Sequence, residues 1–190
     1  MYRIVIFASG SGTNAENIIR YFKDSALARV SWVLCNKKGA GVLQRAESLG
    51  VPTRVFDRKE LETPEFANFV RREADLVVLA GFLLRIPEEL TRSFPGSMIN
   101  VHPALLPNYG GKGMYGMNVH RAVVANGEKK SGITIHYVNE NYDEGAIIFQ
   151  KSVPIDDGDT AEDVAAKIHV LEQENFPQVI ERLLKARNEG

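Results

Sequence analysis

The fold class of this chain is decided by its opening stretch, Arg3-Ile4-Val5-Ile6-Phe7-Ala8-Ser9-Gly10-Ser11-Gly12-Thr13-Asn14. Its first six residues form a short, nearly continuous apolar run, which is typical of a strand buried on both faces. The two glycines that follow mark a tight turn. Between Asn14 and Ala26 the apolar residues recur at helical spacing, at Ala15, Ile18, Ile19 and Phe22. The stretch therefore predicts a buried strand, a glycine turn and an amphipathic helix.

The same alternation continues through the first hundred residues. Further strands are expected at 30–35, 51–56, 76–80 and 97–101, and further helices at 41–49, 63–73 and 87–93. Pro64 suits the first turn of a helix, and Gly50 suits the end of one. Apolar strands that alternate with helices indicate a parallel sheet covered on both faces. We therefore expect an α/β fold with a doubly wound, mostly parallel, Rossmann-like sheet.

The pattern changes after residue 102. Residues 103–117 are rich in glycine and proline, which indicates a long surface loop. The elements expected beyond it are a helix at 119–125, strands at 133–138 and 146–153 with antiparallel pairing, and a helix at 160–186. Thr160 and Asp163 resemble a capping box, and Pro177 is expected to kink or divide the last helix. The whole chain, 1–190, is expected to form a single domain with halves at 1–101 and 102–190.

The composition excludes several classes of protein. The 190 residues are 44% hydrophobic and 25% charged, and 23 basic residues balance 24 acidic ones. This balance provides no bulk basic surface for nucleic acid or an anionic membrane. Cys35 is the single cysteine, so neither an internal disulfide nor a zinc site with the usual spacing is expected. Without a signal peptide or a long apolar run, the sequence predicts a cytoplasmic protein that uses no metal.

The glycine turn is a candidate anion site. Glycines let the backbone approach a ligand, and the free N–H groups at a helix start favour a phosphate. A dinucleotide-binding turn also needs an acid at the end of the second strand, where this chain has Asn36. Ser11, Thr13 and Asn14 therefore suit one terminal phosphate. The alternative is a simple tight turn in which Thr13 or Asn14 caps the helix.

The segment Asn100-Val101-His102-Pro103 is a candidate catalytic motif at the end of the fifth strand. Period two places Asn100 and His102 on one face, where an amide donor and an imidazole could stabilise an oxyanion and move a proton. Asp143, in a polar loop, could orient His102. On spacing alone, the alternatives are a turn-capping Asn, a packed His and a solvated Asp.

The other polar motifs are weaker. Residues 110–113 contain three glycines and a lysine but lack the phosphate-loop spelling, so a flexible lid is expected there. His136 either lines a pocket or is a hydrogen-bonded strand residue. His120 and His169 are interpreted as structural helix residues.

Together these residues resemble the formyltransferase fold, and within it the family of folate-dependent glycinamide ribonucleotide formyltransferases. The matching segments are 9–14, 79–82, 99–107 and 143–145, followed by the helix that carries Glu172. The resemblance covers essentially the whole chain. It implies transfer of a formyl group from 10-formyltetrahydrofolate, a cosubstrate, to the amine of glycinamide ribonucleotide in purine biosynthesis. It also favours the catalytic interpretation of Asn100, His102 and Asp143.

The resemblance implies a role for each candidate residue. Asn100 and His102 would hold the formyl oxygen as it becomes an oxyanion, while Asp143 would orient His102 and assist proton movement through water. The residues that would hold the ribonucleotide are Ser11, Gly12, Thr13, Asn14, Gly81, Pro103 and Glu172. Those that would bind the folate are Leu83, Leu84, Arg85, Ile86, Val138, Asn139, Glu140 and Asp143. Residues 1–101 would then form the phosphate-binding half, and 102–190 the folate-binding and catalytic-loop half.

Three alternatives are weighed against this function. A formyltetrahydrofolate hydrolase has a similar triad but an extra N-terminal regulatory domain, whereas a strand is expected here from residue 3. Methionyl-tRNA formyltransferase carries an added C-terminal domain, for which 190 residues leave no room. A non-catalytic nucleotide-binding module would not need Asn100, His102 and Asp143 together. Either a monomer or a homodimer is compatible with the sequence.

Overall fold

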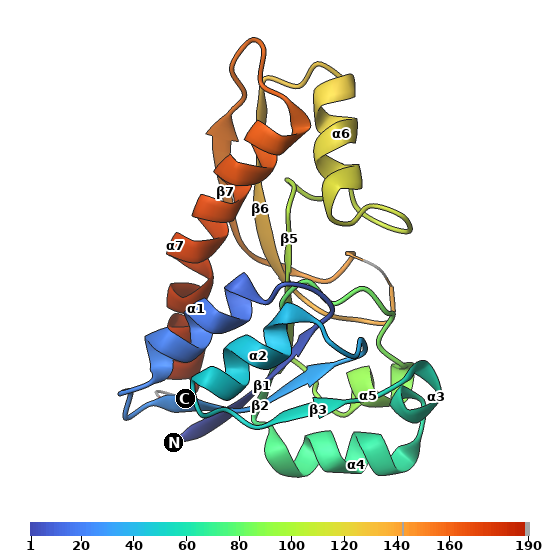
Figure 1. Ribbon diagram of the computed structural model, residues 1–190, viewed down its shortest axis with the longest axis vertical. Helices are drawn as coiled ribbons and strands as arrows, with labels where there is room; N and C mark the ends of the chain where they lie inside the picture. The colour runs from blue at the N-terminus through green and yellow to red at the C-terminus, as the bar shows by residue number, and fades with distance from the viewer. Residues whose placement is uncertain (142, 189–190) are drawn as a thin grey trace.

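A single mixed sheet organises the part of the chain that the computed structural model describes, residues 1–141 and 143–188. The strand order is β3-β2-β1-β4-β5-β6-β7 (Figure 1). The strands are β1 (Tyr2–Ala8), β2 (Ala28–Cys35), β3 (Thr53–Val55), β4 (Leu76–Leu79), β5 (Met98–His102), β6 (Lys130–Tyr137) and β7 (Ile147–Pro154). The helices are α1 (Thr13–Phe22), α2 (Gly41–Ser48), α3 (Arg58–Leu61), α4 (Pro64–Glu73), α5 (Glu88–Arg92), α6 (Met117–Ala125) and α7 (Ala161–Asn188).

The direction of the strands divides the sheet into two parts. Strands β1 to β5 pair in parallel, whereas β6 pairs antiparallel with β5, and β7 antiparallel with β6. The chain leaves β1 toward β2 on one side and reaches β4 on the other, so the strand order reverses between β1 and β4. At such a switch point the loops after neighbouring strands diverge and open a crevice at their carboxyl ends. The predicted fold class is confirmed.

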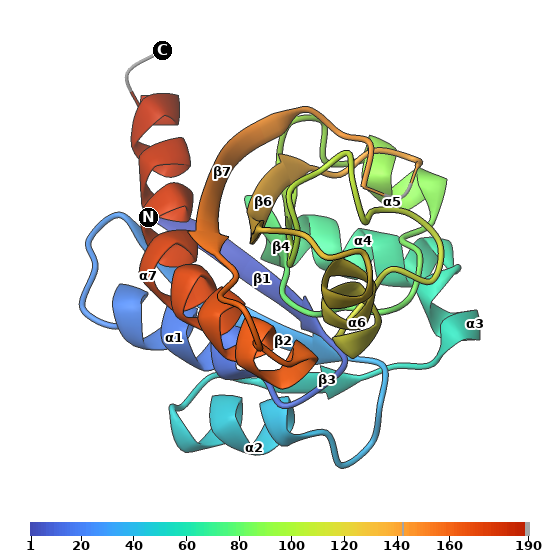
Figure 2. The same ribbon diagram turned by 90° about the horizontal axis from the view of Figure 1, so that it is seen from above.

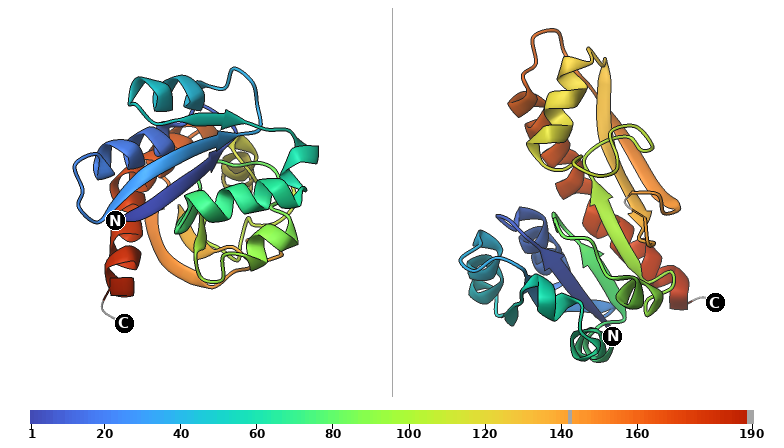
Figure 3. Two further views of the ribbon diagram at one scale, coloured as in Figure 1. Left: turned by 90° about the horizontal axis from the view of Figure 1, so that it is seen from below. Right: turned by 90° about the vertical axis from the view of Figure 1, so that its right-hand side faces the viewer.

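Helices cover both faces of the sheet. They are needed there because the successive apolar side chains of β1 from Ile4 to Ala8 point to opposite faces, and all of them are buried. Ile4 and Ile6 belong to a core cluster with α1, α2 and α7, whereas Val5 and Phe7 belong to a second cluster with α4 and α5. Figure 2 shows these two helical layers on opposite sides of the strands. Figure 3 shows β6 and β7 extending the sheet away from its parallel part, with α7 running alongside both.

Several expected elements differ from those observed. Strand β3 is three residues long rather than six, because Phe56 turns into the core and Asp57 caps the unpredicted helix α3. The loop after β5 is not wholly on the surface, since Ala104 and Leu106 are buried. The capping box between Thr160 and Asp163 is present. No helix in the described part of the chain combines the length and apolar character that crossing a bilayer requires.

Of the two predicted effects of Pro177, a kink or a division of the last helix, the division does not occur. Helix α7 runs without a break from Ala161 to Asn188. Proline lacks the N–H that would bond the carbonyl four residues earlier, which belongs to Gln173. The side-chain amide of Asn17 on α1 donates to that carbonyl at 2.8 Å. A donor from a neighbouring helix thus replaces the missing N–H and removes the cost of an unpaired carbonyl.

Replacing Asn17 with alanine is therefore expected to lower the free energy of unfolding by about 1–2 kcal/mol, because the Gln173 carbonyl loses its donor. Urea unfolding would measure this change. The matched control is Asn175→Ala, since the amide of Asn175 donates to the Leu171 carbonyl within α7, where a helical N–H also reaches that carbonyl. Equal losses of stability in the two variants would contradict the explanation.

Candidate active site

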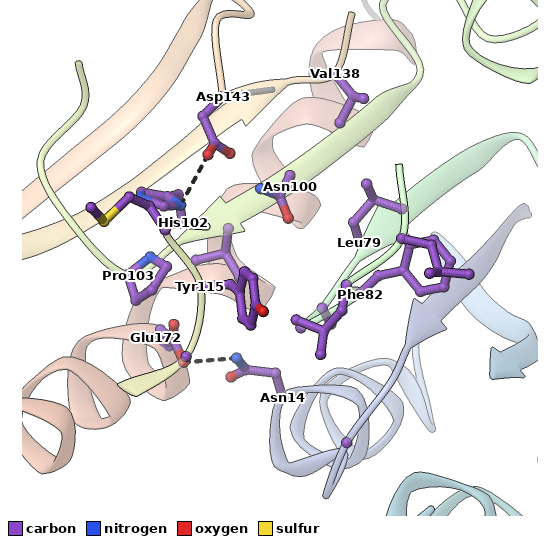
Figure 4. A pocket seen from close by; sticks show the side chains of 18 of the residues that line it. Asn14, Leu79, Phe82, Asn100, His102, Pro103, Tyr115, Val138, Asp143 and Glu172 are labelled. Atoms are coloured by element: carbon purple, nitrogen blue, oxygen red, sulfur yellow. Dashed lines mark hydrogen bonds and ion pairs between the residues drawn. The ribbon is translucent and has the colours of Figure 1, made fainter. Parts of the chain in front are cut away.

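One large cleft lies at the carboxyl ends of β1, β4 and β5, where the strand order reverses. Its volume is about 620 Å³. Figure 4 shows side chains from both parts of the sheet pointing into it, among them Asn14, Asn100, His102, Asp143 and Glu172. Every residue that the sequence analysis assigned to catalysis, the ribonucleotide or the folate lines this cleft. Segments far apart in the sequence therefore meet at the carboxyl edge of the parallel strands.

The glycine turn after β1 leaves several backbone N–H groups without a hydrogen-bond acceptor among the described residues. Gly12 occupies the N-cap position of α1 with φ of 81°, and no side chain caps the helix. The alternative in which Thr13 or Asn14 caps α1 is therefore wrong. Glu16 N–H donates to the Gly12 carbonyl, whereas within the described residues the N–H groups of Gly12, Thr13 and Asn14 have no protein acceptor. These N–H groups and the positive end of the helix dipole form a suitable site for a phosphate.

Asn14 uses its side chain to join α1 to α7. Its amide nitrogen donates to Glu172 Oε2 at 2.8 Å, and its amide oxygen accepts from Gln173 Nε2 at 2.7 Å. Glu172 is thereby held beside the glycine turn although it lies 158 residues away in the sequence. His169 Nδ1 lies 3.9 Å from the same carboxylate, which is the main reason that the pKa of His169 is raised.

Ser9 connects the glycine turn to the loop after β4, a role that the sequence analysis missed. Its side chain is buried, its backbone N–H donates to the Gly81 carbonyl at 3.1 Å, and its Oγ accepts from Leu83 N–H at 3.0 Å. The same Oγ donates to Asn36 Oδ1 at 2.6 Å. The two loops that flank the switch point are therefore fixed relative to each other by one hydroxyl.

The candidate folate residues line the other end of the cleft. Ile86 is buried, whereas Leu83 is exposed to the cleft. The guanidinium of Arg85 donates to the Glu140 carbonyl, and Val138 N–H donates to the Met98 carbonyl. The first contact ties the loop after β4 to the segment after β6, and the second ties that segment to β5. Leu84 and Asn139 line the same end of the cleft.

Asn100 is paired with a second histidine across the sheet. The antiparallel register places Asn100 of β5 directly opposite His136 of β6, and Asn100 Nδ2 lies 3.1 Å from His136 Nε2. His136 Nδ1 lies 2.9 Å from the Tyr137 carbonyl, which can only accept, so the proton is on Nδ1 and Nε2 accepts from Asn100. This bond fixes the amide so that its nitrogen has one further hydrogen available. His136 is thus both a pocket residue and a hydrogen-bonded strand residue.

Each ring nitrogen of His102 has a protein oxygen near it. Its Nε2 lies 2.7 Å from the Tyr109 carbonyl, and its Nδ1 lies 3.6 Å from Asp143 Oδ2. The carbonyl can only accept, so Nε2 carries the proton in the neutral ring and Nδ1 is the free base. Burial lowers the pKa of His102 below its ordinary value, although the Asp143 carboxylate and the Tyr109 carbonyl both act to raise it. The ring is therefore neutral at neutral pH.

Asp143 is an enclosed carboxylate rather than a solvated one. Its Oδ2 accepts from Gly111 N–H at 3.0 Å, and its Oδ1 lies 3.6 Å from His136 Nε2. Burial alone would raise the pKa of Asp143, but the interactions with His136, His102 and Gly111 together hold that pKa below its ordinary value. An ionised Asp143 beside a neutral His102 favours protonation of His102 at Nδ1 during a reaction.

The cleft also contains residues that sequence reasoning did not assign to it. His120 of α6 is buried, its Nδ1 has no partner among the described residues, and burial lowers its pKa. Tyr115 projects from the glycine-rich loop into the middle of the cleft (Figure 4). Lys112 and His169 also line it. A helical histidine carries no sequence signal that distinguishes a pocket wall from a core, because the difference depends on how α6 packs.

Comparisons with known proteins agree with this arrangement. A family model described as "Formyl transferase" matches residues 2–180. The phosphoribosylglycinamide formyltransferase of Bacillus subtilis (strain 168) is 36% identical, and the match covers 100% of this chain and 98% of that protein. The chloroplastic phosphoribosylglycinamide formyltransferase of Vigna unguiculata is 41% identical over 97% of this chain, which spans 62% of that protein's length. The crystal structure of glycinamide ribonucleotide transformylase 1 from Symbiobacterium toebii matches with a TM-score of 0.89 at 31% sequence identity. The match covers 98% of this chain and 89% of that chain.

The fold, the cleft and the family match together define the class. The chain belongs to the formyl transferase family. Within that family it is one of the phosphoribosylglycinamide formyltransferases, enzymes of purine biosynthesis that it matches over nearly its whole length.

Proposed function

We propose that this cleft transfers the formyl group of 10-formyltetrahydrofolate to the amine of glycinamide ribonucleotide. One observation carries the proposal. A phosphate-type glycine turn and the Asn100, His102 and Asp143 side chains line the same cleft of about 620 Å³. A cleft of that size can hold two small molecules end to end and so bring an amine next to a formyl carbon.

The ribonucleotide is proposed to bind with its phosphate on the glycine turn. The N–H groups of Gly12, Thr13 and Asn14 have no protein acceptor among the described residues, so they are available to phosphate oxygens. Glu172 can accept from the ribose hydroxyls. Gly81 and Pro103 line the path from the turn toward His102, and their positions direct the amine to the reacting centre.

The folate is proposed to bind at the opposite end of the cleft. The pteridine would lie against the backbone of Leu83, Leu84, Arg85 and Ile86 on one side and of Val138, Asn139, Glu140 and Asp143 on the other. Backbone N–H and C=O groups suit a flat ring with alternating donors and acceptors. The Arg85–Glu140 contact joins the two walls. In this arrangement 1–101 supplies the phosphate site, Asn100 and one folate wall, while 102–190 supplies His102, Asp143 and the other folate wall.

The proposed reaction moves one proton from the attacking amine to the leaving folate nitrogen. The neutral amine attacks the formyl carbon, and the charge that develops on the formyl oxygen is stabilised by Asn100 and, once His102 has taken up the amine proton, by the imidazolium. His102 accepts the amine proton at Nδ1, the nitrogen that its bond to Tyr109 leaves free. Asp143 stabilises the resulting imidazolium. The proton then passes to the leaving folate nitrogen, so tetrahydrofolate and the formylated ribonucleotide are released without any metal taking part.

The release of the folate product tests this proposal. 10-Formyltetrahydrofolate would be incubated with the protein, with and without glycinamide ribonucleotide, and folate release followed by absorbance. Release that depends on the ribonucleotide is expected. Release without the ribonucleotide would instead identify a formyltetrahydrofolate hydrolase, and no release in either case would favour a non-catalytic nucleotide-binding module.

Two further properties stay predictions. The protein is proposed to act in the cytoplasm, although the names of its plant relatives place those proteins in the chloroplast. The oligomeric state is proposed to be a monomer or a homodimer. Sedimentation would distinguish the two states.

A further inference from the structure

The loop after β5 contains an unusual backbone conformation at Tyr109. Tyr109 and Asp143 each have φ of 57°, and they are the non-glycine residues with positive φ in the described part of the chain. The left-handed region is unfavourable for a tyrosine, and such outliers persist where surrounding contacts impose them. Both residues flank His102: the Tyr109 carbonyl lies 2.7 Å from Nε2, and the Asp143 carboxylate lies 3.6 Å from Nδ1.

The backbone from Tyr109 to Gly111 holds both members of the His102–Asp143 pair. The carbonyl of Tyr109 accepts from His102, and two residues later Gly111 N–H donates to Asp143 Oδ2 at 3.0 Å. Between them, Gly110 packs so closely that an added Cβ would lie 3.3 Å from the Cβ of Asp143. The position of this short segment therefore determines the distance and orientation of the histidine relative to the carboxylate.

The side chain of Tyr109 anchors this segment from outside the cleft. Its hydroxyl donates to Glu128 Oε1 at 2.7 Å and accepts from Asn126 Nδ2 at 2.9 Å. Its ring packs against the small apolar cluster formed by Ala104, Val119 and Val123. Glu128 and Asn126 follow α6, so the anchor joins the catalytic loop to the turn between α6 and β6.

We infer that Tyr109 is a positioning residue for formyl transfer: its side-chain anchor on Glu128 and Asn126 holds its carbonyl on His102 Nε2, and this keeps the neutral imidazole in the tautomer whose Nδ1 is the base. The inference rests on the proposed catalytic role of His102. It goes beyond that role, because it assigns the choice of tautomer to a side chain that does not line the cleft. Without the carbonyl, the two tautomers would compete and Nδ1 would carry a proton part of the time.

The test compares Tyr109→Phe with a matched control. Tyr109→Phe keeps the ring and removes the hydroxyl, so we expect kcat to fall about tenfold, with both KM values within about twofold of wild type. Tyr21→Phe removes an equivalent tyrosine–glutamate bond, that of Tyr21 to Glu181 at 2.8 Å, away from the cleft and should leave kcat unchanged. Glu128→Ala should behave like Tyr109→Phe, whereas Glu128→Gln, which retains an acceptor oxygen, should restore most of kcat.

Nitrogen NMR of the resting protein provides a readout that does not depend on turnover. The sequence has four histidines, so ¹⁵N-histidine labelling with single His→Gln variants would assign His102. We expect the Nε2-protonated tautomer in the wild type and a mixture of tautomers in Tyr109→Phe. An Nδ1-protonated His102 in the wild type would overturn the inference. A fall in kcat in Tyr109→Phe with the tautomer of His102 unchanged would also overturn it. The inference would fail as well if neither kcat nor the tautomer changed in that variant. If His102→Ala retained activity, the proposed catalytic role of His102 would be wrong. The tautomer measured by NMR would still show whether Tyr109 positions the His102 ring.

Discussion

His102→Ala is expected to lower kcat for formyl transfer by about a hundredfold to ten-thousandfold, the range that a positioned acid–base group contributes. The variant loses the base at Nδ1 and one stabilising group for the formyl oxygen. It should fold, because the lost bond to the Tyr109 carbonyl costs about 1 kcal/mol. Ribonucleotide affinity should persist, since the glycine turn lies between β1 and α1 and does not contain His102. Turnover like that of the wild type in a folded variant would refute the mechanism.

The pH dependence of kcat/KM is the second check on His102. Protonation removes the base, so activity should fall as the pH decreases through the pKa of His102. Burial lowers that pKa, so the acid limb should lie below the ordinary histidine value of about 6.5. The Asp143 carboxylate raises the pKa of His102, so Asp143→Asn should move the limb to still lower pH. A limb that moved to higher pH in Asp143→Asn would contradict the assignment.

Gly12→Ala is expected to disrupt the phosphate site and to lower the free energy of unfolding by about 2 kcal/mol or more. Gly12 has φ of 81°, and an added Cβ would lie 2.4 Å from the side chain of Val42 and 2.5 Å from its Cα. The backbone of α2 cannot move that far without displacing the helix. The turn must then shift, and the N–H groups that face the phosphate lose their alignment. Calorimetry should show ribonucleotide affinity reduced at least about tenfold.

Gly10→Ala is the matched control for this substitution. Gly10 lies in the same turn, but an added Cβ there would have no heavy atom within 4 Å, and its φ is not positive. The thermal midpoint of this variant should stay close to that of the wild type. If Gly12→Ala were as stable as Gly10→Ala and bound the ribonucleotide equally well, the proposed phosphate site would be wrong.

The sequence by itself determined the architecture and one end of the site. Apolar runs that alternate with amphipathic segments predict a parallel sheet, because only burial on both faces suits such strands. The glycines after β1 and the Asn100–His102 pair at the end of β5 could be assigned because both patterns are local. Both motifs follow parallel strands, and the carboxyl ends of parallel strands meet at one edge of the sheet, which is why the two motifs lie close together.

Contacts between distant segments were decided only by the tertiary structure. His136 reaches Asn100 because β5 and β6 pair in one particular register, and no local pattern specifies that register. Asn14 meets Glu172, and Asn17 compensates for Pro177, because α1 packs on α7. The enclosure of Asp143 and the anchor on Tyr109 likewise depend on loops that close against each other. Periodicity reports which face of an element is buried, whereas the partners across that face are set by how whole elements pack together.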